Sequence, residues 1–141
     1  MKDPIIYDCN SFPAQLFGEG IVRQVRLIAS PETTGEERIR IVTCTVPAGG
    51  ISEGHIHPDA DEYIYFDIAG KAVLDDVEYD VPAGGIVHAI TGVKHECRNS
   101  DPERTLHLLC LFVPAFKPYG AYPELIQKTQ EYLESINTIN G

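Results

Sequence analysis

Two histidines and a glutamate stand near the middle of the chain, and their side-chain types suit metal binding. His55 and His57 are separated by one residue, so on an extended strand their imidazoles point to the same face. Glu62 follows after 58–61, a segment whose residues favour a turn. A strand that returns after this turn brings the carboxylate back to the two imidazoles. Neutral imidazoles together with a carboxylate suit a divalent transition metal.

Two spaced motifs resemble those of the cupin superfamily. The first is written G-x5-H-x-H-x(3,4)-E-x6-G, and its matches here are Gly49, His55, His57 and Glu62. The second is written G-x5-P-x-G-x2-H-x3-N, and its matches here are Gly84, Gly92, His95 and Asn99. Two positions depart from the pattern without affecting a candidate ligand. Gly70 comes one residue late, which predicts a bulge or a longer turn after Phe66, and Ile90 replaces a proline.

The resemblance implies an all-β fold, the cupin double-stranded β-helix or jelly-roll barrel. It also implies one divalent metal ion, held by His55, His57, Glu62 and His95. Fe²⁺ is favoured, with Ni²⁺, Mn²⁺ or Zn²⁺ as alternatives. In this family the residue at Asn99 supports the strand near the site and is not a ligand.

Length and charge restrict the other possibilities. The 141 residues predict a single domain over 1–141, with a barrel core at about 20–114 and a C-terminal helix at about 122–137. A net charge of -10 argues against nucleic acid and anionic membranes as partners. No apolar run suits a signal peptide or a membrane span, and the 4 cysteines form no C-x-x-C pattern. We therefore expect a cytoplasmic protein with reduced thiols.

Alternating side chains predict the strands that position these residues. Strands are expected at 21–29, 38–46 and 105–113, with a hairpin over 73–81. The tetrapeptide Pro-Ala-Gly-Gly occurs twice, ahead of each motif, and predicts the same turn twice. The segment 105–113 is apolar on both faces except for His107, which favours a homodimer. Residues at helical spacing over 122–137 predict an amphipathic helix outside the barrel, or alternatively a lid or dimer element.

Three further side chains are candidates for the pocket. Cys97 shares parity with His95 and Asn99, so it should point into the barrel, either beside the metal or as a small buried hydrophobe. His88 and His107 could serve as pocket bases, because histidine titrates near neutral pH. For both, a wall residue or a solvated one is the favoured interpretation.

The remaining polar residues near the motifs are expected to face outward. Tyr63 and Tyr65 have the opposite parity to Glu62. Arg38 and Arg40 precede the first motif, and one of them could hold a substrate carboxylate. Because the two share parity with each other and not with their immediate apolar neighbours, an exposed strand face is the favoured prediction.

The ligand set supports two classes of function. Four protein ligands leave one or two open coordination positions, where a metal can act as Lewis acid, template or source of activated water. The resemblance implies an enzyme acting on a small polar molecule, with a dioxygenase-type oxidoreductase ahead of an isomerase or lyase. The alternative is a binding or sensing module without turnover.

Overall fold

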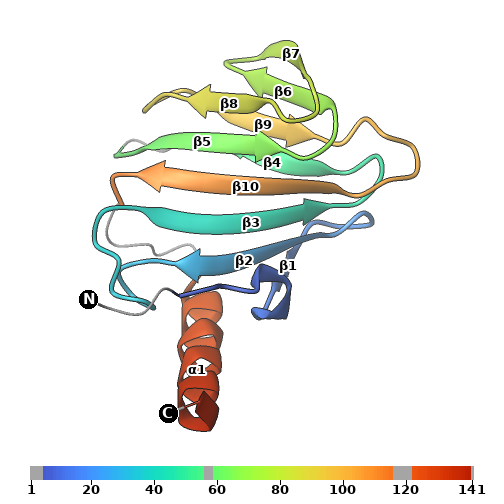
Figure 1. The fold of residues 1–141 in the computed structure, drawn as a ribbon. Coiled ribbons are helices and arrows are strands. Elements are labelled where there is room, and N and C mark those ends of the chain that lie inside the picture. The colour runs from blue at the N-terminus through green and yellow to red at the C-terminus, as the bar shows by residue number, and fades with distance from the viewer. Residues whose placement is uncertain (1–4, 56–58, 116–121, 141) are drawn as a thin grey trace.

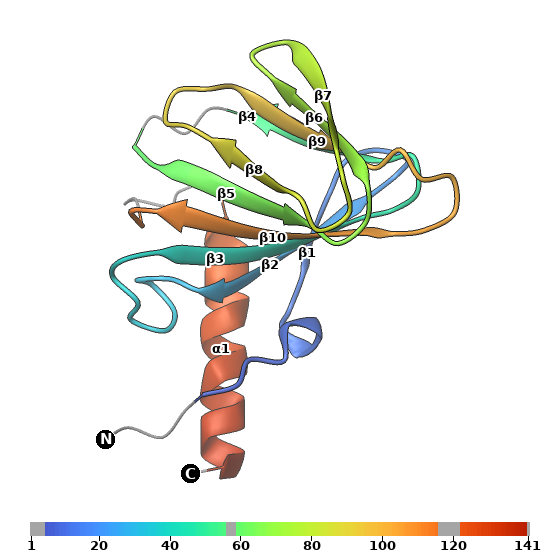
Figure 2. The same ribbon diagram turned by 45° about the horizontal axis from the view of Figure 1, so that its top comes forward.

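The chain forms two facing antiparallel sheets and one C-terminal helix, which confirms the predicted all-β jelly-roll barrel (Figures 1 and 2). The computed structural model describes residues 5–55, 59–115 and 122–140, with only the backbone described for 53–55 and 137–140. A short 3₁₀ turn, η1 (Cys9–Ser11), comes first. The strands are β1 (Gln15–Phe17), β2 (Arg23–Ala29), β3 (Arg40–Val46), β4 (Ile51–His55), β5 (Asp61–Phe66), β6 (Gly70–Leu74), β7 (Val77–Val81), β8 (Ile86–Ala89), β9 (His95–Arg98) and β10 (Leu106–Val113).

The strand order brings distant parts of the sequence together. The six-stranded sheet has the order β1-β2-β3-β10-β5-β8, and the four-stranded sheet has the order β4-β9-β6-β7. Strand β10 therefore lies between β3 and β5, where Phe112 is opposite Arg40 on one side and Glu62 on the other. In the second sheet the backbone of His55 lies opposite His95, after a register shift in β4.

The core lies between the sheets and is built by alternating side chains. Every second residue of β3, β5 and β10 is buried, as expected for strands with one face toward a core. We call this the inner face of the six-stranded sheet, and the opposite side its outer face. The larger apolar side chains of the inner face are Leu27, Val42, Val46, Ile64, Phe66, Leu106, Leu108 and Phe112.

The two Pro-Ala-Gly-Gly segments form the same turn, as predicted. In 47–50 and in 82–85, the amide of the last glycine donates to the proline carbonyl at 2.9 Å. The third residue has a positive φ, +73° at Gly49 and +80° at Gly84, which a side chain would strain. The same type of turn therefore leads out of β3 and out of β7.

The hairpin is confirmed, and the predicted strands begin one or two residues later than expected. Asp75 and Asp76 both have positive φ and connect β6 to β7 in a two-residue turn. Strand β2 begins at Arg23 and β3 at Arg40, each two residues later than predicted. Ahead of β3, the Ser30 carbonyl accepts the amides of residues 33–36, so this loop is closed on itself.

Helix α1 (Pro123–Asn140) packs against the outside of the barrel beside β2, and its first residue is Pro123, which suits the first helical position. Leu125 is buried against the core, and the Thr129 hydroxyl donates to its carbonyl at 2.7 Å. The later turns extend away from the sheets (Figure 1). Among the described helices, none is long and apolar enough to cross a membrane.

Candidate functional site

Glu62 and His95 meet inside the barrel. Glu62 comes from β5 of the six-stranded sheet and His95 from β9 of the four-stranded sheet. His95 Nε2 lies 3.1 Å from Glu62 Oε1, and each side chain is only 5% exposed. A carboxylate removed from water in this way needs a partner, because burial of an unpaired charge is costly. The two sheets thus place one nitrogen and one oxygen donor at a common point.

The second ring nitrogen of His95 fixes the orientation of the imidazole. Nδ1 donates to the Val93 carbonyl at 3.2 Å, which leaves Nε2 facing Glu62. Burial lowers the pKa of His95, but the hydrogen bond and charge of Glu62, with the Val93 carbonyl, raise it above the ordinary value overall. In the neutral ring, Nε2 carries the lone pair, which is the form that binds a metal.

The side chains of the other two predicted ligands lie outside the described part of the structure. His57 is in the segment 56–58, and His55 is described only in its backbone. The described part of the chain holds no group of three or more metal-binding side chains, and half of the predicted set lies beyond it. The donors that are described do fit a metal: both are buried, they come from opposite walls, and Nε2 faces a carboxylate oxygen.

A small cavity adjoins Glu62 and His95. The room inside it is about 20 Å³, and its lining residues are Ser52, Glu62, Ile64, His95, Cys97, Leu108 and Cys110. The wall is therefore apolar or thiol-bearing except at three side chains. Cys97 points inward, as predicted from its parity with His95, and burial and the charge of Glu62 raise the pKa of its thiol. All 4 cysteines are free thiols.

Arg40 corrects the sequence prediction. It was expected on an exposed strand face, but its side chain is fully buried at the end of the inner face. Its guanidinium forms two hydrogen bonds with Glu32, at 2.7 and 3.0 Å. Burial alone would raise the pKa of Glu32, but the hydrogen bonds and charge of Arg40 help to hold it below its ordinary value. Arg38 is exposed, as predicted, and pairs with Glu36.

Arg23 is an inner-face residue that the sequence reasoning missed. It shares parity with Val25 and Leu27 on β2, which was the available signal. Its Nη1 donates to the Ser52 hydroxyl at 3.0 Å, so it reaches across to a strand of the other sheet. Burial raises the pKa of the neighbouring Cys44 thiol to about 11, while the Arg23 charge lowers this pKa and Glu62 raises it. The guanidinium and the carboxylate therefore face the same interior.

His88 and His107 lie on the outer face and do not line the cavity beside Glu62. His88 Nε2 is 2.9 Å from Asp61, and its ring stacks on Tyr63 with centroids 4.2 Å apart. His107 is 55% exposed and pairs with Asp67. The sequence left open whether these histidines are pocket bases, wall residues or solvated residues. In the structure both are solvated.

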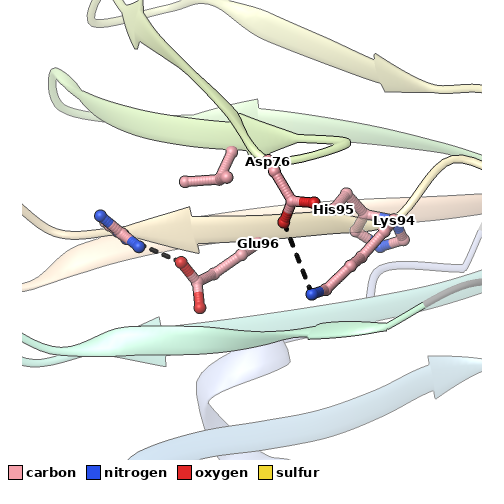
Figure 3. A pocket seen from close by; sticks show the side chains of 6 residues that line it. Asp76, Lys94, His95 and Glu96 are labelled. Atoms are coloured by element: carbon pink, nitrogen blue, oxygen red, sulfur yellow. Dashed lines mark hydrogen bonds and ion pairs between the residues drawn. The ribbon is translucent and has the colours of Figure 1, made fainter.

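The outer side of the four-stranded sheet is covered by ion pairs. Figure 3 shows a hollow there in which the Lys94 and Asp76 side chains approach each other, with Nζ to Oδ1 at 3.7 Å. Next to them Arg98 pairs with Glu96 at 2.7 Å. These charges already have partners within the sheet. The hollow is therefore a weaker candidate for binding an ionic ligand than the barrel interior.

Asn99 supports the barrel from behind the site, as the resemblance implied. Its Nδ2 donates to the carbonyls of Val46 and Arg104, at 2.9 and 2.8 Å, and its Oδ1 accepts the amide of Asp101. These bonds tie the end of β9 to the end of β3 and to the loop before β10. The side-chain amide of Asn99 therefore holds the strands in place and does not bind a ligand.

Solved structures share this fold at low sequence identity. A predicted oxalate decarboxylase from Thermotoga maritima is 15% identical, with a TM-score of 0.68, over 78% of this chain and 99% of that one. KdgF from Halomonas sp. is 17% identical, with a TM-score of 0.64, over 82% and 97%. An RmlC-like cupin from Shewanella frigidimarina is 16% identical, with a TM-score of 0.61, over 82% and 95%. No protein-family model and no curated protein matches the sequence.

Proposed function

Because the chain has the cupin fold, we propose that it binds one divalent transition-metal ion inside the barrel and acts there on a small polar organic molecule. The observation that carries this proposal is the buried approach of His95 Nε2 to Glu62 Oε1 from opposite sheets. Among imidazole and carboxylate sites, Fe²⁺ is favoured, with Ni²⁺, Mn²⁺ and Zn²⁺ as alternatives.

The protein side chains have distinct roles in this proposal. His95 and Glu62, with His55 and His57 as the predicted remaining ligands, hold the ion, which would supply Lewis-acid or redox chemistry to a bound molecule. The Val93 carbonyl keeps the imidazole in the tautomer that presents Nε2. Ile64 and Leu108 make part of the cavity apolar, which limits water around the reacting molecule.

Metal analysis of the purified protein tests the binding part of this proposal. We expect about one ion per wild-type chain, consistent with one complete ligand set. His95→Ala and Glu62→Gln should lose most of that metal and remain folded, because apolar strands form the core. His107→Ala is the matched control, since this histidine is exposed on the outer face, and it should keep its metal. Full occupancy in His95→Ala would remove His95 from the site.

Oxygen consumption tests the catalytic part. The iron-loaded protein is screened against small organic acids, sugars and phenols, with His95→Ala as the inactive reference. Consumption that depends on one compound and on His95 supports a dioxygenase. Metal-dependent conversion without oxygen uptake supports an isomerase or lyase instead. Binding without conversion of any compound would replace the enzyme with a small-ligand sensor.

A further inference from the structure

Arg23 is a buried cation at the seam between the two sheets. It is the first residue of β2, only 8% exposed, and its inward side chain hydrogen-bonds to Ser52 of β4. The sheets are not hydrogen-bonded to each other between β2 and β4. The Arg23–Ser52 bond thus links the two sheets at a place where no strand pairing joins them.

The guanidinium of Arg23 has no carboxylate partner among the described residues. Its Nη1 donates to Ser52, and its Cζ lies 5.3 Å from the centroid of the Phe17 ring. Within the same part of the chain neither Nε nor Nη2 has a hydrogen-bond acceptor, and the Nε atom is buried. Nε and Nη2 form one edge of the planar group, the edge that holds a carboxylate through two parallel bonds.

An incomplete pairing of this kind is costly and therefore calls for an explanation. Buried charges in proteins are normally paired, because removal from water costs several kcal/mol per ion. The ring of Phe17 and the hydroxyl of Ser52 are neutral and offset only part of that cost. Cys44 is a neutral thiol nearby, since its pKa stays at about 11 even with the Arg23 charge acting on it.

Ser52 connects Arg23 to the cavity of the metal site. The Ser52 side chain lines the cavity that also contains Glu62 and His95, and its hydroxyl holds the Arg23 guanidinium. The room inside this cavity is about 20 Å³, close to the space that one water molecule needs. It therefore accepts only a small terminal group of a ligand, and Ser52 lies between that group and the Arg23 guanidinium.

We propose that Arg23 binds an oxyanion group, carboxylate or phosphate, on the small molecule that the barrel takes, with Ser52 holding the guanidinium in place. This deepens the proposed function and rests on it for the identity of the pocket. It defines the ligand class as small organic anions and makes Arg23 a specificity-determining residue. Neutral polar molecules of the same size would leave the charge of Arg23 unpaired and are therefore rejected.

Nuclear magnetic resonance titration tests this proposal directly, because a buried arginine Nε–H gives its own signal. The probes are acetate, the neutral isostere acetamide, and inorganic phosphate, each added to metal-free protein and to Zn²⁺-loaded protein. We expect acetate, phosphate or both to shift the Arg23 Nε–H and Ser52 amide signals to saturation in both forms. Acetamide should leave them unchanged. Whichever anion binds more tightly identifies the group on the ligand.

Substitutions locate the binding. Arg23→Gln should weaken anion binding about 10- to 100-fold, as expected for loss of a charge-assisted pair of hydrogen bonds. Arg23→Lys keeps the charge without the planar edge and should weaken it less, and it replaces Arg23→Gln if that variant does not fold. Arg104→Gln is the control, since Arg104 is 67% exposed and pairs with Asp101. It should bind anions as the wild type does.

The outcomes separate this proposal from the metal proposal. Equal anion affinity in wild type and Arg23→Gln, or no saturable binding of either anion, overturns the role of Arg23. Anion binding that disappears without metal and survives in Arg23→Gln also overturns it, because the ion alone then holds the anion. Absence of metal from the purified protein contradicts the proposed function and leaves the metal-free titration as a valid test of Arg23.

Discussion

The two faces of the six-stranded sheet have an unusual distribution of polarity. The inner face holds two arginines and a glutamate among its apolar residues, and Arg23, Arg40 and Glu62 are all buried. The outer face carries exposed apolar side chains, including Ile86 at 64% and Leu109 at 39% exposure. Single exposed hydrophobic residues are ordinary, but neighbours on adjacent strands form a patch that suits a partner.

The difference shows that depth alone does not decide which side chains of this barrel are polar. Charges inside are acceptable where each has a partner, as Arg40 has Glu32. Apolar groups outside are acceptable where another surface covers them. The outer side of the four-stranded sheet differs from this outer face. It carries ion pairs such as Lys71 with Asp80, as expected for a surface that faces water. Four predictions test this comparison.

The largest effect is expected at the paired inner charge. Arg40→Met should lower the free energy of unfolding by about 3 kcal/mol, because it leaves the Glu32 carboxylate without its partner in a half-buried position. Urea unfolding followed by circular dichroism measures the change. Arg38→Met, at an 86% exposed arginine, should change it by less than about 0.5 kcal/mol. The double variant Arg40→Met with Glu32→Leu should recover much of the loss; no recovery would deny that the pair is the cause.

The second effect concerns the outer face. We propose that a second copy of the chain covers it, through Leu109 and its cross-strand neighbour Tyr65. Leu109→Asp should then weaken the dimer by about 2 kcal/mol or more, the loss expected at a central interface residue. Light scattering over a range of concentrations measures the mass. Val77→Asp, at an exposed residue of the β7 hairpin, is the control and should stay dimeric. A wild-type monomer at micromolar concentration would be decisive against this interface.

The third prediction contrasts Arg23 with Arg40. Because Arg23 has no carboxylate partner among the described residues, Arg23→Met should leave the ligand-free stability unchanged or raise it by about 1 kcal/mol. The same urea unfolding experiment as for Arg40→Met provides the comparison. A loss of stability as large as that of Arg40→Met would mean that Arg23 stabilises the folded state. The two inner arginines would then have the same structural role.

The smallest expected effect is a change in the pKa of Asp61, at the start of β5 in the six-stranded sheet. The hydroxyl and amide of Thr91, with His88, lower the pKa of Asp61 from 3.8 to about 2. A depressed carboxyl pKa stabilises the fold above about pH 4, and this contribution is lost as the pH falls toward 2. Thr91→Val should raise the Asp61 pKa toward 3.8 in a nuclear magnetic resonance titration. Asp101, held near 2 by the amides of Arg104 and Glu103, should not change.

Much of the architecture follows from local rules that the sequence contains. Alternation with period two gave the strands and the direction of Tyr63, Tyr65 and Cys97, because adjacent side chains on a strand must point to opposite faces. The two Pro-Ala-Gly-Gly turns depend on glycine at positive φ, which is a property of the residue itself. The spaced motifs placed Glu62 and His95 together, and the structure brings them to 3.1 Å.

Tertiary structure alone decided which of two faces became the interior. Around Arg40 both faces are partly apolar, with Ile41 on one side and Val42 on the other, so parity does not distinguish inside from outside. Pairing of β3 with β10 turned Arg40 inward, and the loop then supplied Glu32 as its partner. In the same way Arg23 met Ser52 only because two sheets close on each other. Alternation relates neighbours along one strand, whereas burial depends on strands that are distant in sequence.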